Sequence, residues 1–423
     1  MTDAERWEVY RALLQRSNNG VLKRGTTKEV ANLLAVPKQS VQKIWRRAKD
    51  NVSNGEAVDV SHRRKGKCGR KPKEIDLEQI FNIPLHCRTT MRSIAVVLEV
   101  SPSTIHRYVK HGLVRRHSNA IKPTLKDDNK KARVKFCLSM LDKNTFSHQP
   151  KFVDMFNIIH IDEKWFYMTK KSTTYYLHPL EEDPVRSCQS KNFIGKVMFL
   201  AAMARPRFDE EGNEIFSGKI GMFPFVTMQE AQRRSRNREA GTMELKPMDS
   251  IKREDIKRCL IEKVLPNIRE RWPTEDFGKT IFIQQDNART HVDVNNEEFQ
   301  EAASQHGFDI RLMCQPPNSP YMNILDLGFF RAIQSLQHKV CPTTVEQLVH
   351  AVEEAYDEYP PKQVNKIFLT LQSCLLETMK IGGANTYKIP HMKKDRLERE
   401  GRLPIQLACD PILVQEVISS LAC

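Results

Sequence analysis

The sequence lacks paired cysteines. Its ten cysteines are scattered over 423 residues, with no Cys-x-x-Cys pair and no compact Cys/His cluster. Zinc fingers and disulfide frameworks need such spacing, so both are excluded. The sequence also lacks an apolar leader and any run approaching the roughly 18 to 20 apolar residues of a membrane span. We therefore expect a soluble intracellular protein with reduced thiols.

Positive charge is concentrated in the first third of the chain. Residues 1–135 contain 30 Lys and Arg against 13 Asp and Glu, whereas residues 136–423 contain 37 against 39. Neutralising DNA phosphates releases condensed counterions, so a basic region joined to a near-neutral one is typical of a DNA-binding head on a catalytic body. The alternative is a basic surface that only keeps the chain soluble.

Three aspartates stand in contexts that direct them toward one site. Asp162 follows the apolar run 156–161, Asp286 follows the run 280–285, and Asp326 opens an amphipathic stretch. Two strand ends and a helix start can converge, and carboxylates brought together repel one another unless a divalent cation lies between them. The pattern predicts a metal-dependent enzyme acting on nucleic acid. Any single aspartate, however, is more often a solvated surface group or a helix cap.

These aspartates lie in motifs that resemble those of a known family. Residues 160–166 (HIDEKWF), 285–291 (QDNARTH), 317–320 (PNSP) and 325–330 (LDLGFF) are similar, in order, to motifs of the transposases of plant mariner-like DNA elements. The 39 residues between Asp286 and Asp326 match the spacing of the plant branch. The resemblance extends from about residue 5 to about residue 405.

The resemblance implies a nuclear cut-and-paste DNA transposase. Asp162, Asp286 and Asp326 would be its catalytic residues and the ligands of two Mg²⁺ ions per active site, with Mn²⁺ as a substitute. Its partners would be double-stranded DNA, as terminal inverted repeats and target, and a second copy of the chain, with no membrane. The alternative is a catalytically silent, transposase-derived protein that binds specific DNA sequences.

The expected fold class is α+β and multidomain, with an all-α head of tandem helix-turn-helix units and an RNase H-like α/β catalytic domain with a mixed sheet. The expected boundaries are 1–60 and 79–125 for the two helix-turn-helix units, 61–78 for a basic linker, 126–150 for a linker helix, 151–345 for the catalytic domain and 346–423 for a C-terminal helical region. The expected strands are 158–166, 196–204, 219–226, 280–285 and 309–314, with helices near 251–271 and 297–306.

The first helix-turn-helix unit is predicted over residues 27–51, after a helix at 5–16. Its expected core positions are Val30, Ala31, Leu33, Leu34, Val41, Ile44 and Trp45. The second helix would expose side chains suited to reading DNA, namely Lys38, Gln39, Gln42, Lys43, Arg46, Arg47 and Lys49. An ordinary helical hairpin with solvated charges is the alternative.

A second unit of the same kind is predicted over residues 89–109. Its expected core positions are Met91, Ile94, Ala95, Leu98, Ile105, Tyr108 and Val109, and its expected DNA-facing residues are Ser103, His106, Arg107 and Lys110. The linker between the units carries Arg63, Arg64, Arg70 and Lys71. Residues 69–72 (GRKP) look like an AT-hook core for the minor groove, and the same run suits a nuclear localisation signal.

Other positions have weaker interpretations. The basic stretch 115–133 would contact DNA or a partner subunit, or form a solvated linker helix. Glu163 should point to the strand face opposite Asp162 and is read as structural. Asn287, Arg289 and His291 suit orientation of DNA or of the metal site as well as turn formation. Relatives usually carry Asp where this chain has Tyr321, which could displace the loop that precedes Asp326 and impair catalysis.

Overall fold

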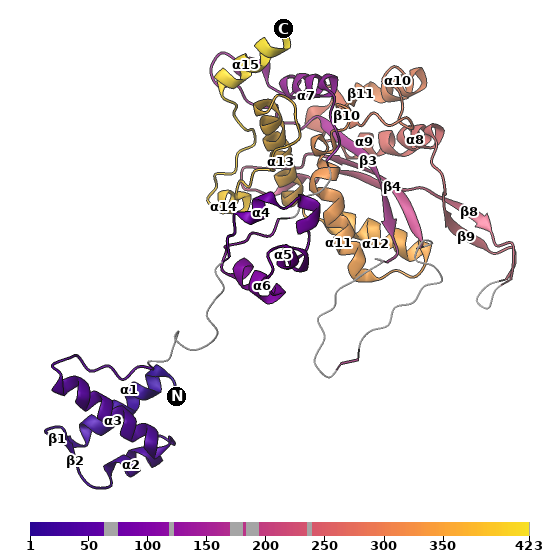
Figure 1. Cartoon of the computed structure of the whole chain (residues 1–423). Coiled ribbons are helices and arrows are strands. Elements are labelled where there is room, and N and C mark those ends of the chain that lie inside the picture. The colour runs from indigo at the N-terminus through magenta and orange to yellow at the C-terminus, as the bar shows by residue number, and fades with distance from the viewer. Residues whose placement is uncertain (63–74, 118–121, 170–180, 183–193, 235–238, 423) are drawn as a thin grey trace. The chain divides into compact units, whose positions relative to one another are not determined.

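The computed structural model describes residues 1–62, 75–117, 122–169, 181–182, 194–234 and 239–422. The chain divides into two compact units, Met1–Asn119 and Ala120–Cys423 (Figure 1). Within the described ranges, no helix combines the length and apolar character that a membrane crossing requires.

The first unit begins with three helices and a short hairpin. Helices α1 (Asp3–Gln15), α2 (Thr26–Leu33) and α3 (Lys38–Ser53) are joined by strands β1 (Ser17–Asn18) and β2 (Val21–Leu22) and by a turn before α3. Thr2 and Glu5 form a capping box that fixes the start of α1. The helices enclose a small core of Val9, Leu13, Val30, Ala31, Val41, Ile44, Ala48 and Val60. Residues 26–53 therefore form the expected helix-turn-helix.

The second part of this unit repeats the arrangement. It contains α4 (Gln79–Asn82), a 3₁₀ turn (Leu85–Arg88), α5 (Met91–Val97) and α6 (Pro102–Lys110), around the buried residues Ile83, Ile94, Ala95, Leu98 and Ile105. The Thr90 hydroxyl caps α5. Two core predictions are wrong, because Leu33 is 61 % exposed and Met91 is 44 % exposed. Each occupies the end residue of a short helix, where the chain turns away from the core.

The second unit is built on a five-stranded mixed sheet. Strands β3 (Ile158–Tyr167), β4 (Lys196–Ala204), β7 (Lys219–Pro224), β10 (Ile281–Gln285) and β11 (Ile310–Cys314) lie in the order β11-β10-β3-β4-β7. The first three strands along the chain pair antiparallel, and β10 and β11 add in parallel. This is the strand order of an RNase H-like domain, and it places β10 directly beside β3.

Helices cover both faces of this sheet. One face packs its Phe166, Phe199 and Met203 against α7 (Asp127–Ser139), α11 (Phe330–Val340), α12 (Val345–Glu358) and α13 (Pro361–Lys380). The other packs its Ile161 and Leu200 against α8 (Arg253–Cys259), α9 (Leu265–Arg271) and α10 (Glu297–Ala303). Successive residues of β3 and β4 alternate between these cores, as strand geometry requires.

Several elements lie outside this three-layer arrangement. A hairpin of β8 (Val226–Glu230) and β9 (Met243–Pro247) extends away from the sheet (Figure 1), and β5 (Arg207–Phe208) pairs with β6 (Glu214–Phe216). Helices α14 (Lys394–Arg399) and α15 (Pro411–Ala422) follow α13. A five-residue π-helix, Leu260–Val264, joins α8 to α9.

Helix α7 belongs to the second unit, and its Arg133 is fully buried. The guanidinium of Arg133 donates to the Gly383 carbonyl over 2.7 Å and to the Ser319 hydroxyl over 2.8 Å. Buried charges require such partners. Arg133 is therefore enclosed by its own unit and, unlike the solvated-helix alternative for the basic stretch 115–133, does not face solvent. It ties α7 to the loop that precedes Asp326.

Candidate functional site

Asp162 lies in the middle of β3, on the sheet face that packs against α11 and α13. It is paired with Ala201 of β4. Its Oδ1 accepts a hydrogen bond from the backbone N–H of Glu163 over 2.8 Å. The side chain is therefore held by its own strand and partly withdrawn from water.

Asp286 directly follows the last residue of β10. The parallel register pairs Gln284 of β10 with His160 of β3, so Asp286 reaches the level of Asp162 as β10 ends. Its Oδ1 accepts from the Ala288 N–H over 2.8 Å and lies 2.8 Å from Nδ1 of His291. A tight turn after the strand thus fixes this carboxylate.

Asp326 is the second residue of a π-helical turn, Leu325–Phe329, that continues into α11. Leu325, Phe329 and Ile333 are buried beneath it, and Leu336 packs against the same core. The stretch that Asp326 opens is therefore amphipathic, as the sequence predicts. The π-helical geometry of its first turn was not predicted from the sequence. Asp326 lies at the positive end of the helix, where a carboxylate is favoured.

Asn323 holds this helix start against β3. Its side-chain amide donates to the Ile161 carbonyl over 3.0 Å, and its Oδ1 accepts from the Leu325 N–H over 3.0 Å. The loop is also anchored by Gln284, which donates to the Met322 carbonyl over 2.8 Å. These contacts bring Asp326 beside Asp162.

The three aspartates influence one another electrostatically. Burial, followed by the charges of Asp326 and Glu163, raises the pKa of Asp162 to about 8. Burial and the charge of Asp286 also raise the pKa of Asp326, although Lys164 and a hydrogen bond with Asp162 oppose that rise. Asp162 and Asp326 thus form a hydrogen-bonded pair, and Asp286 acts on both through its charge.

His291 accounts for the different behaviour of Asp286. The hydrogen bond from His291 lowers the pKa of Asp286, against the effect of burial. Burial disfavours the charged imidazole, yet hydrogen bonds to Asp286 and Glu163 raise the pKa of His291 to about 11. Asp286 is therefore ionised and compensated by a cation, whereas the Asp162–Asp326 pair carries negative charge that is only partly balanced by Lys164.

The sequence predicts no role at this site for Lys164 or Asn323, and it predicts a structural role for Glu163. Glu163 does lie on the face opposite Asp162, as strand alternation predicts, but its Oε2 lies 2.8 Å from Nε2 of His291. Lys164 could have been found, because it is two residues from Asp162 on the same strand face. The Asn323 and Glu163 contacts join residues 162 and 128 positions apart, so sequence spacing gave no signal.

The three aspartates can be compared with the set of ligands that a divalent metal ion requires. Among the residues that the structure describes, no three His, Cys, Asp or Glu side chains lie close enough to hold an ion as they stand. Hard oxygen ligands are nevertheless what Mg²⁺ prefers. The pKa of Asp162 is raised first by burial and then by the charges of Asp326 and Glu163, and a bound cation would offset that charge repulsion. The carboxylates of Asp162, Asp286 and Asp326 are therefore the kind of ligands that a divalent cation would take.

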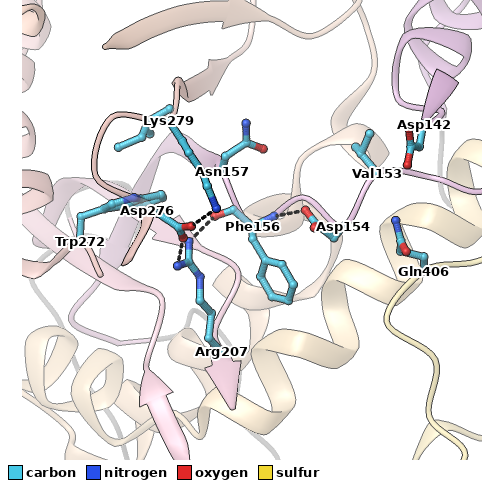
Figure 2. Close-up of a pocket in the computed structure, with 11 residues that line it drawn as sticks. Asp142, Val153, Asp154, Phe156, Asn157, Arg207, Trp272, Asp276, Lys279 and Gln406 are labelled. Carbon is cyan, nitrogen blue, oxygen red and sulfur yellow. Dashed lines mark hydrogen bonds and ion pairs between the residues drawn. The ribbon is translucent and has the colours of Figure 1, made fainter. Parts of the chain in front are cut away.

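A separate hollow of about 460 Å³ lies at the opposite end of β10, where the strand begins. Figure 2 shows Arg207 and Lys279 converging on Asp276 there, and both form ion pairs with it. The Arg207 guanidinium also stacks over the rings of Phe156 and Trp272. Arg207 and Lys279 are thus paired with Asp276, and none of the residues predicted to be functional lines this hollow.

The first helix-turn-helix exposes most of its predicted DNA-facing residues on α3. Lys38, Gln39, Gln42, Lys43, Arg46 and Lys49 are all exposed. Arg47 differs from the prediction of an exposed side chain, because it is half-buried and its guanidinium pairs with Asp59 over 2.9 Å. It also donates to the Ser61 carbonyl. Because successive helix residues point about 100° apart, Arg47 points away from the face of Arg46 and toward the segment that follows α3.

In the second helix-turn-helix, all four residues predicted to face DNA are exposed. Ser103, His106, Arg107 and Lys110 are exposed on α6. The linker residues Arg63, Arg64, Arg70 and Lys71, together with the AT-hook-like run, lie outside the described residues.

Tyr321 contacts the segment that precedes α7. The Lys122 Nζ lies 5.8 Å from the centroid of the Tyr321 ring and 5.5 Å from that of Tyr387. The same ammonium donates to the carbonyls of Asn385 and Tyr387. Tyr321 therefore forms part of a small aromatic cage around a cation.

Comparison with known proteins gives a fold likeness over nearly the whole chain. The pre-cleavage Mos1 transpososome is 14 % identical, with a TM-score of 0.52, covering 91 % of this chain and 98 % of that chain. The Mos1 mariner paired-end complex with Mn is 15 % identical, with a TM-score of 0.52 and coverages of 92 % and 99 %. The Mos1 strand transfer complex is 15 % identical, with a TM-score of 0.50 and the same coverages.

Two further comparisons complete this result. Residues 1–55 match a family model described as a domain of unknown function, DUF7769. A search of curated proteins gave no match. Because the identities to the Mos1 structures are low, the likeness establishes a shared fold, a helical head followed by an RNase H-like domain.

Proposed function

We propose that this chain is a mariner-type DNA transposase. The observation that carries the proposal is the placement of the three aspartates: β10, which ends just before Asp286, lies beside the central strand β3 that carries Asp162, and Asn323 ties the helix start with Asp326 to the same strand. Two strands and one helix supply these carboxylates from positions 124 and 40 residues apart along the chain. The plant mariner-like motifs in which they lie support the same assignment.

Asp162, Asp286 and Asp326 would hold Mg²⁺ or Mn²⁺, with two ions per active site as the working hypothesis. The chemistry that such ions supply is stabilisation of the attacking and leaving oxygens of an in-line displacement at phosphorus. The chain's own residues then have distinct tasks. Asn323 holds Asp326 beside β3, the Ala288 N–H and His291 orient Asp286, and Lys164 provides a fixed cation that can contact a DNA phosphate.

The head would bind the terminal inverted repeats of the element. Exposed residues of α3 and α6, including Arg46 and Arg107, suit base and phosphate contacts in successive major grooves. The Mos1 structures of similar fold are described as paired-end and strand transfer complexes. By analogy, two copies of this chain would pair two transposon ends, cut them and join them to target DNA in the nucleus.

A full-length cleavage assay tests this function. Purified protein, Mg²⁺ and a plasmid carrying the matching terminal repeats should give strand cleavage at the repeat ends. Asp162→Ala, Asp286→Ala or Asp326→Ala should each remove cleavage and leave repeat binding intact, because the head and the carboxylates lie in different units. Glu210→Ala, at an exposed turn between β5 and β6, is the matched control and should cleave normally.

The same assay separates the proposal from its alternative. A wild-type protein that binds the repeats with high affinity but cuts no strand at any Mg²⁺ or Mn²⁺ concentration would be a silent, transposase-derived DNA-binding protein. The bulky Tyr321 is the residue that favours this alternative. Cleavage that survives Asp326→Ala would instead show that the third ligand lies elsewhere.

A further inference from the structure

His291 lies between two carboxylates that come from different strands. Its Nδ1 is 2.8 Å from Oδ1 of Asp286, and its Nε2 is 2.8 Å from Oε2 of Glu163. The imidazole is almost fully buried, with 3 % of its side-chain surface exposed. The ring therefore joins the end of β10 to the middle of β3 through two direct contacts.

On the Asp286 side, the contact selects one carboxylate oxygen. Oδ1 receives both the His291 ring nitrogen and the Ala288 N–H, each at 2.8 Å. Oδ2 has no hydrogen-bond partner among the residues that the structure describes. Two donors on one oxygen fix the rotation of the carboxylate, so the second oxygen stays available in a defined position.

On the other side, the contact between His291 and Glu163 fixes the imidazole relative to β3. Glu163 follows Asp162 directly, and its N–H donates to Asp162 Oδ1 over 2.8 Å. Its side chain is 12 % exposed and approaches His291 from the opposite sheet face. The Glu163 backbone thus holds the Asp162 carboxylate directly, and the Glu163 side chain holds the Asp286 carboxylate through His291.

We propose that Glu163 and His291 are positioning residues that set the separation between the Asp162 and Asp286 carboxylates for a divalent cation. This inference rests on the proposed function and deepens it, because neither residue needs to touch the metal. Partners of this kind, one step behind the ligands, typically change metal affinity by about 10- to 100-fold when they are removed.

Two amide substitutions separate the effects of the two contacts that His291 makes, because each keeps one contact and removes the other. In His291→Asn the amide nitrogen takes the approximate place of Nδ1, which keeps the Asp286 contact and loses that to Glu163. In His291→Gln the amide takes the approximate place of Nε2, which keeps the Glu163 contact and frees Asp286. His306→Gln, in the exposed 3₁₀ turn Gln305–Gly307, is the control.

The primary measurement is Mn²⁺ binding to the full-length, DNA-free protein by titration calorimetry. We expect His291→Gln to raise the Mn²⁺ dissociation constant at least about tenfold. His291→Asn and Glu163→Gln, which keeps an acceptor for Nε2, should raise it less than His291→Gln does. The Mg²⁺ concentration for half-maximal cleavage should follow the same order, with the maximal rate largely recovered at saturating metal.

A merely structural role makes a different prediction. The thermal midpoint of each metal-free variant measures the stability of its fold. If His291 had only a structural role, metal affinity would fall in step with that midpoint, and His291→Asn and His291→Gln would lose the same affinity. Equal dissociation constants for the wild type and His291→Gln would overturn the inference and leave the proposed function standing. A folded wild type that binds no Mn²⁺ would overturn the proposed function, and the inference with it.

Discussion

The side-chain amide of Asn323 donates a hydrogen bond to the carbonyl oxygen of Ile161 over 3.0 Å, at a position with no solvent exposure. Ile161 precedes Asp162, and Asn323 stands three residues before Asp326. One buried hydrogen bond therefore joins the strand that carries the first candidate ligand to the helix start that carries the third.

Asn323→Ala should weaken both stability and cleavage. It leaves the Ile161 carbonyl and the Leu325 N–H without their partner, at a cost of about 1–3 kcal/mol for each buried group. We expect a lower free energy of unfolding by urea titration and a fall in Mg²⁺-dependent cleavage of about tenfold or more. Asn213→Ala removes an amide from an exposed turn and is the control. Normal cleavage at reduced stability would restrict Asn323 to a structural role.

The stability of the metal-free protein should depend on pH through Asp162. Its pKa is about 8 in the folded chain and 3.8 in the unfolded chain, because burial and the charges of Asp326 and Glu163 disfavour its ionised form. A raised carboxyl pKa gives a stabilising contribution that is complete below about pH 4 and is lost as the pH rises toward 8.

Asp162→Asn removes that loss, because its amide stays neutral. In EDTA the variant should therefore be more stable than the wild type at pH 8, by on the order of 1–3 kcal/mol, and nearly equal to it at pH 4. Urea unfolding at the two pH values measures this difference. Asp309→Asn is the control, since its exposed carboxyl has a pKa lowered by Arg311 and should not stabilise the protein at pH 8. A wild-type advantage at pH 8 would contradict the prediction.

Arg46 and Arg47 form a matched pair for the DNA-binding head. Arg46 is exposed on α3, whereas Arg47 is half-buried and paired with Asp59. We expect Arg46→Ala to weaken binding to repeat DNA and to reduce its salt dependence by about one unit, if it contacts a phosphate. A base contact would instead cost about 1–3 kcal/mol and relax preference at one position.

Arg47→Ala should act mainly on folding of the head. It removes an ion pair and the donor to the Ser61 carbonyl, so the thermal midpoint of the first unit should fall while the salt slope of DNA binding stays unchanged. Anisotropy titrations at several salt concentrations, paired with thermal unfolding, separate the two effects. A loss of salt dependence in Arg47→Ala, with unchanged stability, would reverse the assignment.

Tyr321→Asp should raise cleavage if the wild type binds its ends but cuts them slowly. Lys122 lies over the Tyr321 ring, so an aspartate there could form an ion pair with the same ammonium and hold the loop before Asp326. We expect a gain of up to about tenfold, measured on pre-bound DNA ends. The gain should vanish with Lys122→Met and in an Asp326→Ala background. Equal rates for wild type and Tyr321→Asp would mean that the tyrosine is tolerated.

Much of the fold could be predicted from local patterns. The strands near 158–166 and 196–204 match β3 and β4 closely, because each contains a short, largely apolar run, 158–161 in β3 and 197–204 in β4, of the kind that a strand buried on both faces requires. The helix-turn-helix units could also be predicted, since buried apolar residues recur at helical spacing, as Val41 and Ile44 do in the first unit and Ile94 and Leu98 in the second. Where a helix ended, as at Leu33 and Met91, periodicity overstated burial.

The candidate site was predictable only in part. The sequence by itself determined the identity of Asp162, Asp286 and Asp326 and their strand and helix contexts, because motif and periodicity are properties of neighbouring residues. The tertiary structure alone decided that His291 bridges Asp286 to Glu163, that Asn323 joins Ile161 to the Asp326 helix, that Arg133 is buried under the same loop, and that Arg47 turns to Asp59. These contacts join elements that are distant in the chain, or side chains whose direction depends on what packs beside them, and a hydrogen bond forms only where packing brings donor and acceptor within about 3 Å.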